Sequence, residues 1–197
     1  MTKLIALLLA LVMVMALAAC NATDEKKQEK GDSPLEILEK VWDSYSEDEK
    51  FPVSGGDMQT HMDQMEANEN YEIPNAPGIY NMEQKEELPY IFYISEENVA
   101  KVEEAATMVH MMNGNNFTCG TFRLTDSKDV DGFVKSAKES IMGNQWMCGQ
   151  PDQLIIATFG SDVVMIAFGI NDAIDPFMEK LTAAYPDAEL VVQESLV

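Results

Sequence analysis

Residues 153–170, QLIIATFGSDVVMIAFGI, are β-branched and almost entirely apolar apart from a short polar break. Two segments, Gln153–Phe159 and Asp162–Ile170, flank the break at Gly160 and Ser161. A glycine followed by a small polar residue suits a type II′ turn, so the stretch predicts a β-hairpin. Strands this apolar are typical of the middle of a sheet, where at least one face is covered. The hairpin is therefore expected to be central.

A second hairpin is indicated upstream by Asn113-Gly114, the dipeptide that most strongly favours a two-residue turn. It joins Glu104–Met112 to Asn116–Leu124. The alternative is one helix over residues 96–112, because several apolar residues there also follow helical spacing: Val99, Val102, Ala106 and Val109. We favour the hairpin and leave the helix as the open alternative.

A helix is expected after each hairpin. The first begins within Asp126–Asp129 and ends at Gly143. The second begins at an acidic cap, Asp172 or Asp175, with Pro176 tolerated in its first turn. The chain is thus expected to repeat the order hairpin, helix, hairpin, helix.

A short internal repeat supports this order. Residues 122–129 and 168–175 both read as a strand that runs into an acid-capped helix. Two hairpin–helix units would form one antiparallel sheet with helices packed on one face. An N-terminal helix is expected over about Pro34–Asp48, where Ser33 and Glu36 can form a capping box. The expected fold class is α+β.

The chain is strongly acidic. It has 197 residues, of which 46% are hydrophobic, which suits one folded domain. Acidic side chains number 34 against 13 basic ones, for a formal charge of −21. This charge repels nucleic acid and anionic lipid, so we exclude nucleic-acid binding and expect any membrane attachment to be covalent or apolar. The charge favours a soluble monomer, and the alternative is an acidic face that attracts a cationic partner.

The N-terminus has the layout of a lipoprotein signal peptide. Lys3 gives a positive start, and residues 4–17 are an apolar run of 14, shorter than the about 20 residues of a membrane-spanning helix. The motif LAAC at residues 17–20 resembles the lipobox of bacterial lipoproteins. We expect residues 1–19 to be removed and Cys20 to carry the lipid, at the cell membrane and facing outside the cytoplasm. The alternative is an uncleaved signal anchor with an incidental cysteine.

A polar segment separates this signal from the domain. Residues 21–33, NATDEKKQEKGDS, have no apolar side chain larger than alanine, so residues 20–33 are expected to tether a single acidic domain over residues 34–197. Together with the motif AATMVHMMN at residues 105–113, this layout resembles a family of small Gram-positive bacterial lipoproteins defined only as a domain of unknown function. The resemblance covers about residues 35–185 and implies a surface lipoprotein without assigning an activity.

Two cysteines remain beyond Cys20. Outside the cytoplasm, Cys119 and Cys148 favour a disulfide, which would close a loop of about 30 residues and contribute about 3 kcal/mol in the chain-entropy model. The alternative is two separate reduced thiols. The pair lacks the Cys-x-x-Cys spacing of thioredoxin-like redox sites, and it is not a feature expected from the family above.

Methionines and a histidine share one face of a short helix expected around Asp57–Ala67. Met58, His61, Met62 and Met65 follow the spacing i, i+3, i+4 and i+7. Thioether sulfur and imidazole suit Cu(I), so the cluster is a candidate soft-metal site. The same spacing is typical of a helix that buries methionines in a core, and with 14 methionines in the chain we favour the core face.

Catalytic patterns are missing from the sequence. His61 and His110 are the only histidines, and neither lies in a zinc motif; nucleophile-elbow and phosphate-loop motifs are also absent. DVDG at residues 129–132 resembles part of a calcium loop, but Lys138 occupies the position that needs a glutamate. We therefore expect no enzyme and no cofactor, but a lipid-anchored binding or accessory module for an unidentified protein or small molecule. The alternative is a copper-binding lipoprotein.

Overall fold

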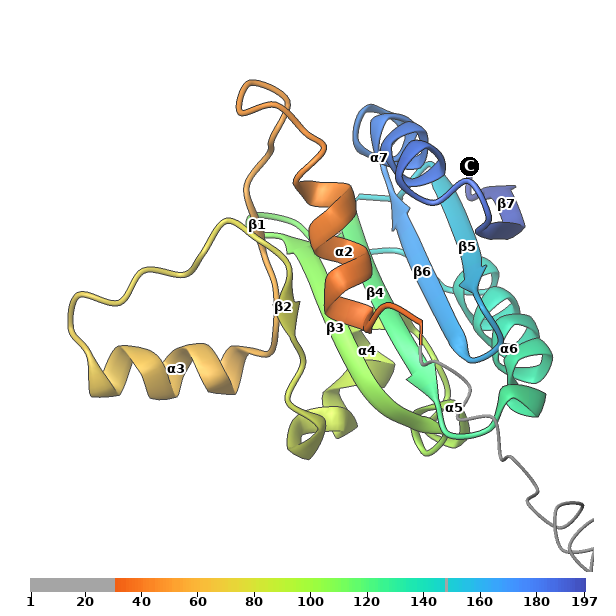
Figure 1. The fold of residues 1–197 in the computed structure, drawn as a ribbon, viewed down its shortest axis with the longest axis horizontal. Helices are drawn as coiled ribbons and strands as arrows, with labels where there is room; N and C mark the ends of the chain where they lie inside the picture. The colour runs from red at the N-terminus through yellow and green to blue at the C-terminus, as the bar shows by residue number, and fades with distance from the viewer. Residues whose placement is uncertain (1–30, 148) are drawn as a thin grey trace, which may run out of the picture. The chain divides into compact units, whose positions relative to one another are not determined.

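A computed structural model describes residues 31–147 and 149–197, which form one α+β unit. Its seven-stranded antiparallel sheet has the order β1-β3-β4-β6-β5-β7, and β2 also pairs with β3 (Figure 1). The strands are β1 (Val53–Ser54), β2 (Gly78–Ile79), β3 (Val102–His110), β4 (Phe117–Leu124), β5 (Gln153–Phe159), β6 (Val163–Gly169) and β7 (Glu189–Ser195). The α-helices are α2 (Pro34–Trp42), α3 (Met58–Ala67), α4 (Leu88–Phe92), α5 (Glu96–Val99), α6 (Val130–Met142) and α7 (Asn171–Ala184), and two 3-10 helices are η1 (Met82–Glu87) and η2 (Ser127–Asp129).

Two hairpins form the middle of the sheet, as predicted. β3 and β4 make the first, β5 and β6 make the second, and β4 pairs with β6. Only residues 96–99 of the alternative long helix are helical, in α5. The turn of the second hairpin is longer than expected, because Phe159 pairs with Val163 and leaves three residues, 160–162, between the strands. Gly160 begins this turn with a φ of 58°, a left-handed value that suits glycine.

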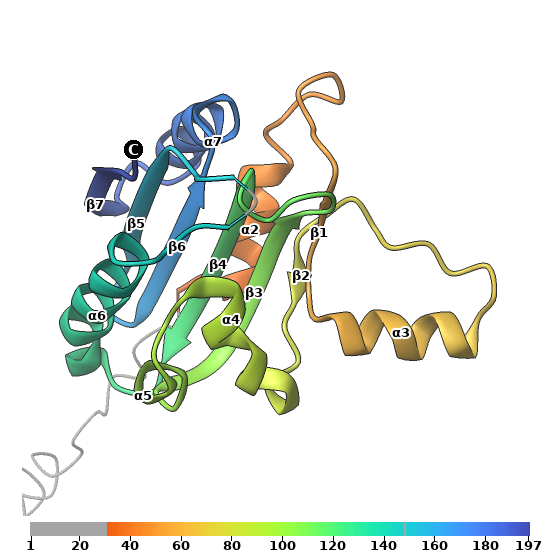
Figure 2. The ribbon, with the colours of Figure 1, turned by 180° about the vertical axis from the view of Figure 1, so that it is seen from behind.

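Helices cover both faces of the sheet, which corrects the expectation that they pack on one face (Figure 2). Alternate residues of a strand point to opposite sides. In β5, Ile155 and Ala157 pack with α2 and α7 in one core, whereas Leu154 and Ile156 pack with α4, α5 and α6 in another. Every residue of β6 is buried. Coverage on both faces accounts for the unbroken apolar run in the sequence.

The handedness of two crossovers explains why α6 and α7 lie on opposite faces. In the first crossover, α6 connects β4 to β5, which is parallel to β4 and lies beyond β6 in the sheet. In the second crossover, α7 connects β6 to β7, which is parallel to β6 and lies beyond β5. Both steps go in the same direction along the sheet, but β4 and β6 run antiparallel. Connections between parallel strands are right-handed in about 98% of cases, so the two helices have to use opposite faces.

Helix α2 is shorter than expected. It begins with the predicted capping box, in which Ser33 and Glu36 each accept the backbone N–H of the other. It ends at Trp42, short of Asp48. Just beyond, the hydroxyl of Ser44 donates a 2.6 Å hydrogen bond back to a helix carbonyl, which competes with further helical turns.

Helix α7 is capped by a residue from outside its own segment. Neither Asp172 nor Asp175 caps it, contrary to expectation. The carboxylate of Asp152, which precedes β5, instead accepts a 2.9 Å hydrogen bond from the N–H of Asn171. The helix therefore begins earlier than expected, and Pro176 lies in its second turn.

A buried arginine on β4 binds the segment that precedes α2. Arg123 on β4 is 1% exposed and donates to Glu104 (3.2 Å), to Asp162 (2.9 Å) and to the carbonyls of Asp32 (2.8 Å) and Gly31 (3.3 Å). Burial alone would lower the pKa of Arg123, but the hydrogen bonds and charges of Asp162 and Glu104 raise it. The charged guanidinium thus ties Gly31 and Asp32, which precede α2, to the sheet.

Candidate functional site

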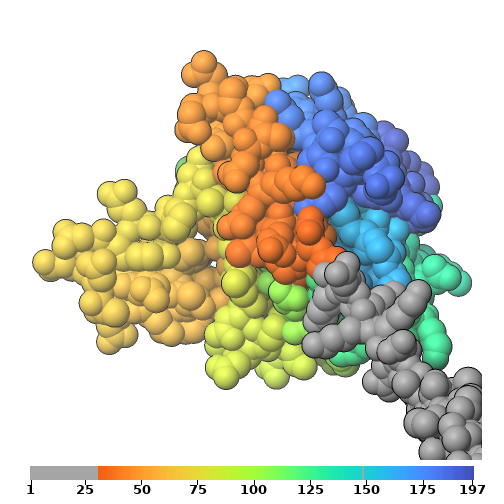
Figure 3. Space-filling view, viewed as in Figure 1, coloured from red at the N-terminus to blue at the C-terminus, as the bar shows by residue number. Residues whose placement is uncertain are grey.

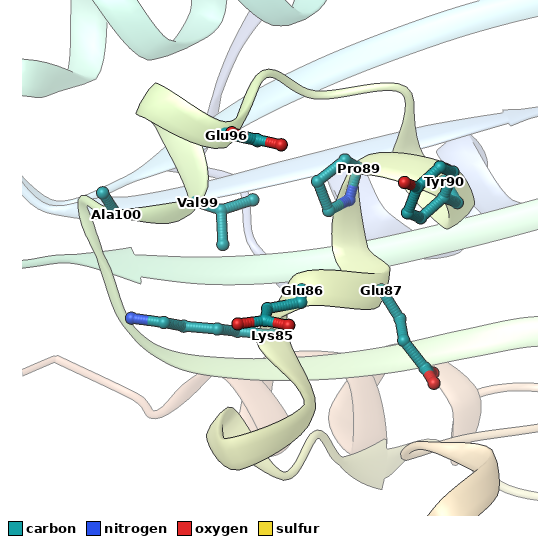
Figure 4. Close-up of a pocket in the computed structure, with 8 residues that line it drawn as sticks. All are labelled: Lys85, Glu86, Glu87, Pro89, Tyr90, Glu96, Val99 and Ala100. Atoms are coloured by element: carbon teal, nitrogen blue, oxygen red, sulfur yellow. The ribbon is translucent and has the colours of Figure 1, made fainter.

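A cavity of about 620 Å³ lies where the chain folds back between β2 and β3 (Figure 4). η1 and α4 build one side of it, and α5 builds the other. Its volume falls within the range of small-ligand sites. The lining residues are Lys85, Glu86, Glu87, Pro89, Tyr90, Glu96, Val99 and Ala100.

Local sequence explains this reversal of the chain. Leu88 and Phe92 bury the inner side of α4 in the core that contains α6. The helix then ends at Tyr93, the only non-glycine residue with a left-handed φ, 54°, in the described ranges. The ring of Tyr93 packs edge-on against Trp146, with 4.9 Å between ring centroids, which supports this conformation. Ser95 then caps α5, and the reversal places α5 across the cavity from α4.

The cavity combines carboxylates, an aromatic ring and an apolar floor. Glu86 and Glu96 are exposed and lie on opposite sides of Val99, which is 5% exposed (Figure 4). Glu87 is exposed and extends away from Val99. The three carboxylates form no ion pair with any part of the chain that the structure describes. The ring of Tyr90 is also free for a ligand, because this residue is 81% exposed.

The charge of the lining favours a cationic ligand. Three glutamates outnumber one lysine, Lys85. An exposed aromatic face attracts ammonium or guanidinium groups by about 0.5–1 kcal/mol. The lining contains no serine, cysteine or histidine, so it provides no nucleophile paired with a base. The arrangement can bind an amine that has an apolar portion.

A smaller cavity of about 180 Å³ lies beside Asp57 and His61, both buried. The carboxylate of Asp57 accepts hydrogen bonds from the N–H and the hydroxyl of Thr60, both at 2.8 Å, and from the N–H of Asn81 at 3.1 Å. Burial alone would raise the pKa of Asp57, but these hydrogen bonds lower it. Asp57 is therefore the N-cap of α3 and also binds the backbone at Asn81.

The predicted methionine–histidine cluster lies on α3, as expected, but its members have different surroundings. His61 is buried, with Nε2 donating to the carbonyl of Gly55 and Nδ1 accepting from the hydroxyl of Tyr71, both at 2.8 Å. The methionines Met58, Met62 and Met65 are 56%, 55% and 43% exposed. The expected burial of this face in the core is therefore wrong, because α3 lies outside the layers of the sheet. Copper binding by all four residues would require His61 to give up a hydrogen bond.

Cys148 and Cys20 lie outside the described residues, so the disulfide and the lipid attachment stay predictions. Cys119 is buried on β4, in the core formed with α2 and α7. Burial raises the pKa of its thiol well above the usual value. Such a thiol stays protonated and is a poor nucleophile, so Cys119 itself is not a reactive centre.

His110 has a structural role at the end of β3. Its Nδ1 accepts a hydrogen bond from the N–H of Met112 at 3.1 Å, and its ring stacks on Phe51 with 6.1 Å between centroids. Across residues 31–147 and 149–197, no three His, Cys, Asp or Glu side chains lie close enough to hold a metal ion. In the same ranges, no helix combines the length and the apolarity needed to cross a bilayer.

Sequence reasoning missed the cavity. The available signal was the change from EQKEE at residues 83–87 to the aromatic run at residues 89–94, which places carboxylates next to tyrosines. That change does not show that the chain reverses at Tyr93. Comparison with protein families, curated proteins and solved structures found no match to this chain.

Proposed function

We propose that this protein is a lipid-anchored binding module that acts outside the cytoplasm and does not catalyse a reaction. Its support is the LAAC motif ending at Cys20, the polar tether and the net charge of −21. The resemblance of residues 105–113 to small Gram-positive lipoproteins of unknown function agrees with this assignment. In the fold, these residues form the end of β3 and the start of the hairpin turn.

The ligand that we propose is a cation with an apolar portion, bound in the cavity beside Tyr90. The observation that carries this proposal is the acidic lining, whose carboxylates lack ion-pair partners in the described chain, together with the exposed ring of Tyr90 in the same lining. Negatively charged groups that line a cavity attract a cation into it. Val99 and Pro89 would contact the apolar portion.

Isothermal titration with spermidine, agmatine and choline tests the proposed site, with acetate as the anionic comparison. We expect the amines to bind and acetate not to bind. E86Q/E96Q should weaken amine binding by at least about tenfold, because it removes both carboxylates that flank Val99. Y90A should weaken it as well, whereas Y90F should retain binding because the aromatic face remains.

The matched control is E139Q/E179Q, which removes two exposed carboxylates, one on α6 and one on α7. It changes the net charge by the same amount as E86Q/E96Q without touching the cavity, and it should leave amine binding unchanged. Equal weakening in E139Q/E179Q and E86Q/E96Q would mean that the amines respond only to total charge. That result, or a lack of amine binding in the wild type, would overturn the proposed ligand class.

A further inference from the structure

Residues 55–77 form an arm that leaves one edge of the sheet and returns to it. Ser54 of β1 pairs with Val109, and Gly78 of β2 pairs with Thr107, two residues earlier in β3. The arm is thus inserted between two short strands on one edge. Helix α3 stands away from the sheet in both ribbon views, and the arm projects beyond the other elements in Figure 3.

The root of the arm is tightly fixed. A Cβ atom on Gly55 would lie 1.9 Å from the backbone nitrogen of Gly78, so the two glycines allow the outgoing and returning chains to touch. The hydroxyl of Thr107 accepts from the N–H of Gly56 and donates to its carbonyl, both at 2.9 Å. Asp57 and His61 add the hydrogen bonds described above. These contacts hold α3 in one position at its base.

The returning chain is fixed as well. The side-chain oxygen of Asn75 accepts a 2.7 Å hydrogen bond from the N–H of Val53, and the backbone carbonyl of Asn75 accepts a 3.1 Å bond from the indole N–H of Trp42. Tyr71 packs beside His61, with 6.0 Å between ring centroids. The arm is therefore an ordered projection, and a partner that binds it would lose little free energy to ordering it.

Helix α3 has almost no core of its own. Of its ten residues, nine are exposed and only His61 is buried. An isolated helix shorter than about 12–15 residues is marginal in water. Its exposed methionines, Met58, Met62 and Met65, lie on one face by their spacing. The fold thus exposes an apolar stripe to solvent on a helix that contributes little burial to the stability of the domain.

The surroundings of this stripe carry one sign of charge. Exposed carboxylates follow along the arm at Asp63, Glu66, Glu69 and Glu72. No lysine or arginine occurs between Lys50 and Lys85. An apolar stripe on an arm whose charged residues are all acidic is complementary to an apolar stripe accompanied by positive charge.

We propose that the methionine face of α3 docks a cationic amphipathic helix of a partner protein. Methionine side chains are flexible and polarizable, so they adapt to the apolar side of such a helix, while its lysines and arginines face the four carboxylates. A second copy of this chain would bring two acidic arms together, and an anionic membrane would repel the arm. This surface is separate from the cavity beside Tyr90, and the inference does not rest on the proposed cavity ligand.

The test uses the whole chain, solubilised in detergent, and a fluorescent synthetic Lys/Leu amphipathic helix of about 18 residues. A peptide of the same composition in scrambled order controls for net charge. Fluorescence anisotropy should show that the amphipathic peptide binds more tightly than the scrambled one. M58Q/M62Q should weaken binding by at least about tenfold, because it removes two exposed thioethers at little cost in helix propensity.

The matched control is M142Q/M147Q, which replaces methionines that are 42% and 79% exposed outside the arm. It should bind the peptide like the wild type. Equal binding of the scrambled peptide, or equal weakening in M142Q/M147Q, overturns the proposal. Loss of binding in E86Q/E96Q alone also overturns it, and assigns the peptide to the cavity.

Discussion

Replacement of Arg123 by methionine should destabilise the domain by about 3 kcal/mol. The arginine is almost fully buried and donates to two carboxylates and two backbone carbonyls. Removal of one partner of a buried ion pair costs about 3–5 kcal/mol. We expect a loss at the lower end of this range because the side chains of Glu104 and Asp162 are 39% and 29% exposed, so water can partly solvate them.

The loss can be measured by guanidinium unfolding and by calorimetry. For a domain of this size, 1 kcal/mol shifts Tm by about 2–4 °C, so R123M should melt about 6–12 °C below the wild type. K135M is the matched control, because it removes an exposed lysine of α6. Its stability should stay within about 0.5 kcal/mol of the wild type.

The cause of the loss can be tested separately. If R123M is unstable because Glu104 and Asp162 are left as unpaired charges, the added changes E104Q and D162N should restore part of the stability. No recovery in this triple variant would contradict the electrostatic cause. An R123M protein within about 0.5 kcal/mol of the wild type would refute the reasoning as a whole.

Three further predictions concern the anchor, the core and the acid response. C20S should leave unprocessed precursor and abolish fatty-acid labelling, and normal labelling in this variant would contradict lipid attachment. I156A and I166A each truncate a fully buried side chain and should cost about 2–5 kcal/mol by chemical denaturation; a shift below about 0.5 kcal/mol in both would argue against the sheet. Hydrogen bonds from Ser46, chiefly its N–H, lower the pKa of Glu49 from 4.5 to about 2, so Glu49 stabilises the fold above pH 4.5 and loses this effect as the pH falls toward 2. Urea midpoints measured across that window should fall less steeply for E49Q than for the wild type, and identical slopes would exclude this contribution.

The central part of the fold could be predicted because local and global signals agree there. The apolar run over residues 163–169 forms a strand with every residue buried, and Asn113-Gly114 lies between paired strands. Ser33 and Glu36 form the capping box that their spacing indicates. The faces taken by α6 and α7 could not be read from residue patterns, because they depend on strand order and crossover handedness.

The surfaces proposed to bind depend on features that periodicity does not encode. Helical spacing placed three methionines on one face of α3, but it could not show that all three stay exposed. The cavity depends on a left-handed backbone at Tyr93, a conformation uncommon for a non-glycine residue. The residues on either side of Arg123 in β4 are apolar. Its burial depends on the carboxylates of Glu104 and Asp162, which lie far from it in the sequence.

The two edges of the sheet differ in how readily they could accept a foreign strand. On the β3 side, two strands of two residues each, interrupted by the arm, leave no long continuous edge for β-augmentation. At the other edge, β7 runs uninterrupted over seven residues, with Leu190 and Val191 38% and 45% exposed. Protection there comes from the charges of Glu189 and Glu194 and from the register shift against β5. Fibril-like association of this protein should therefore start at β7.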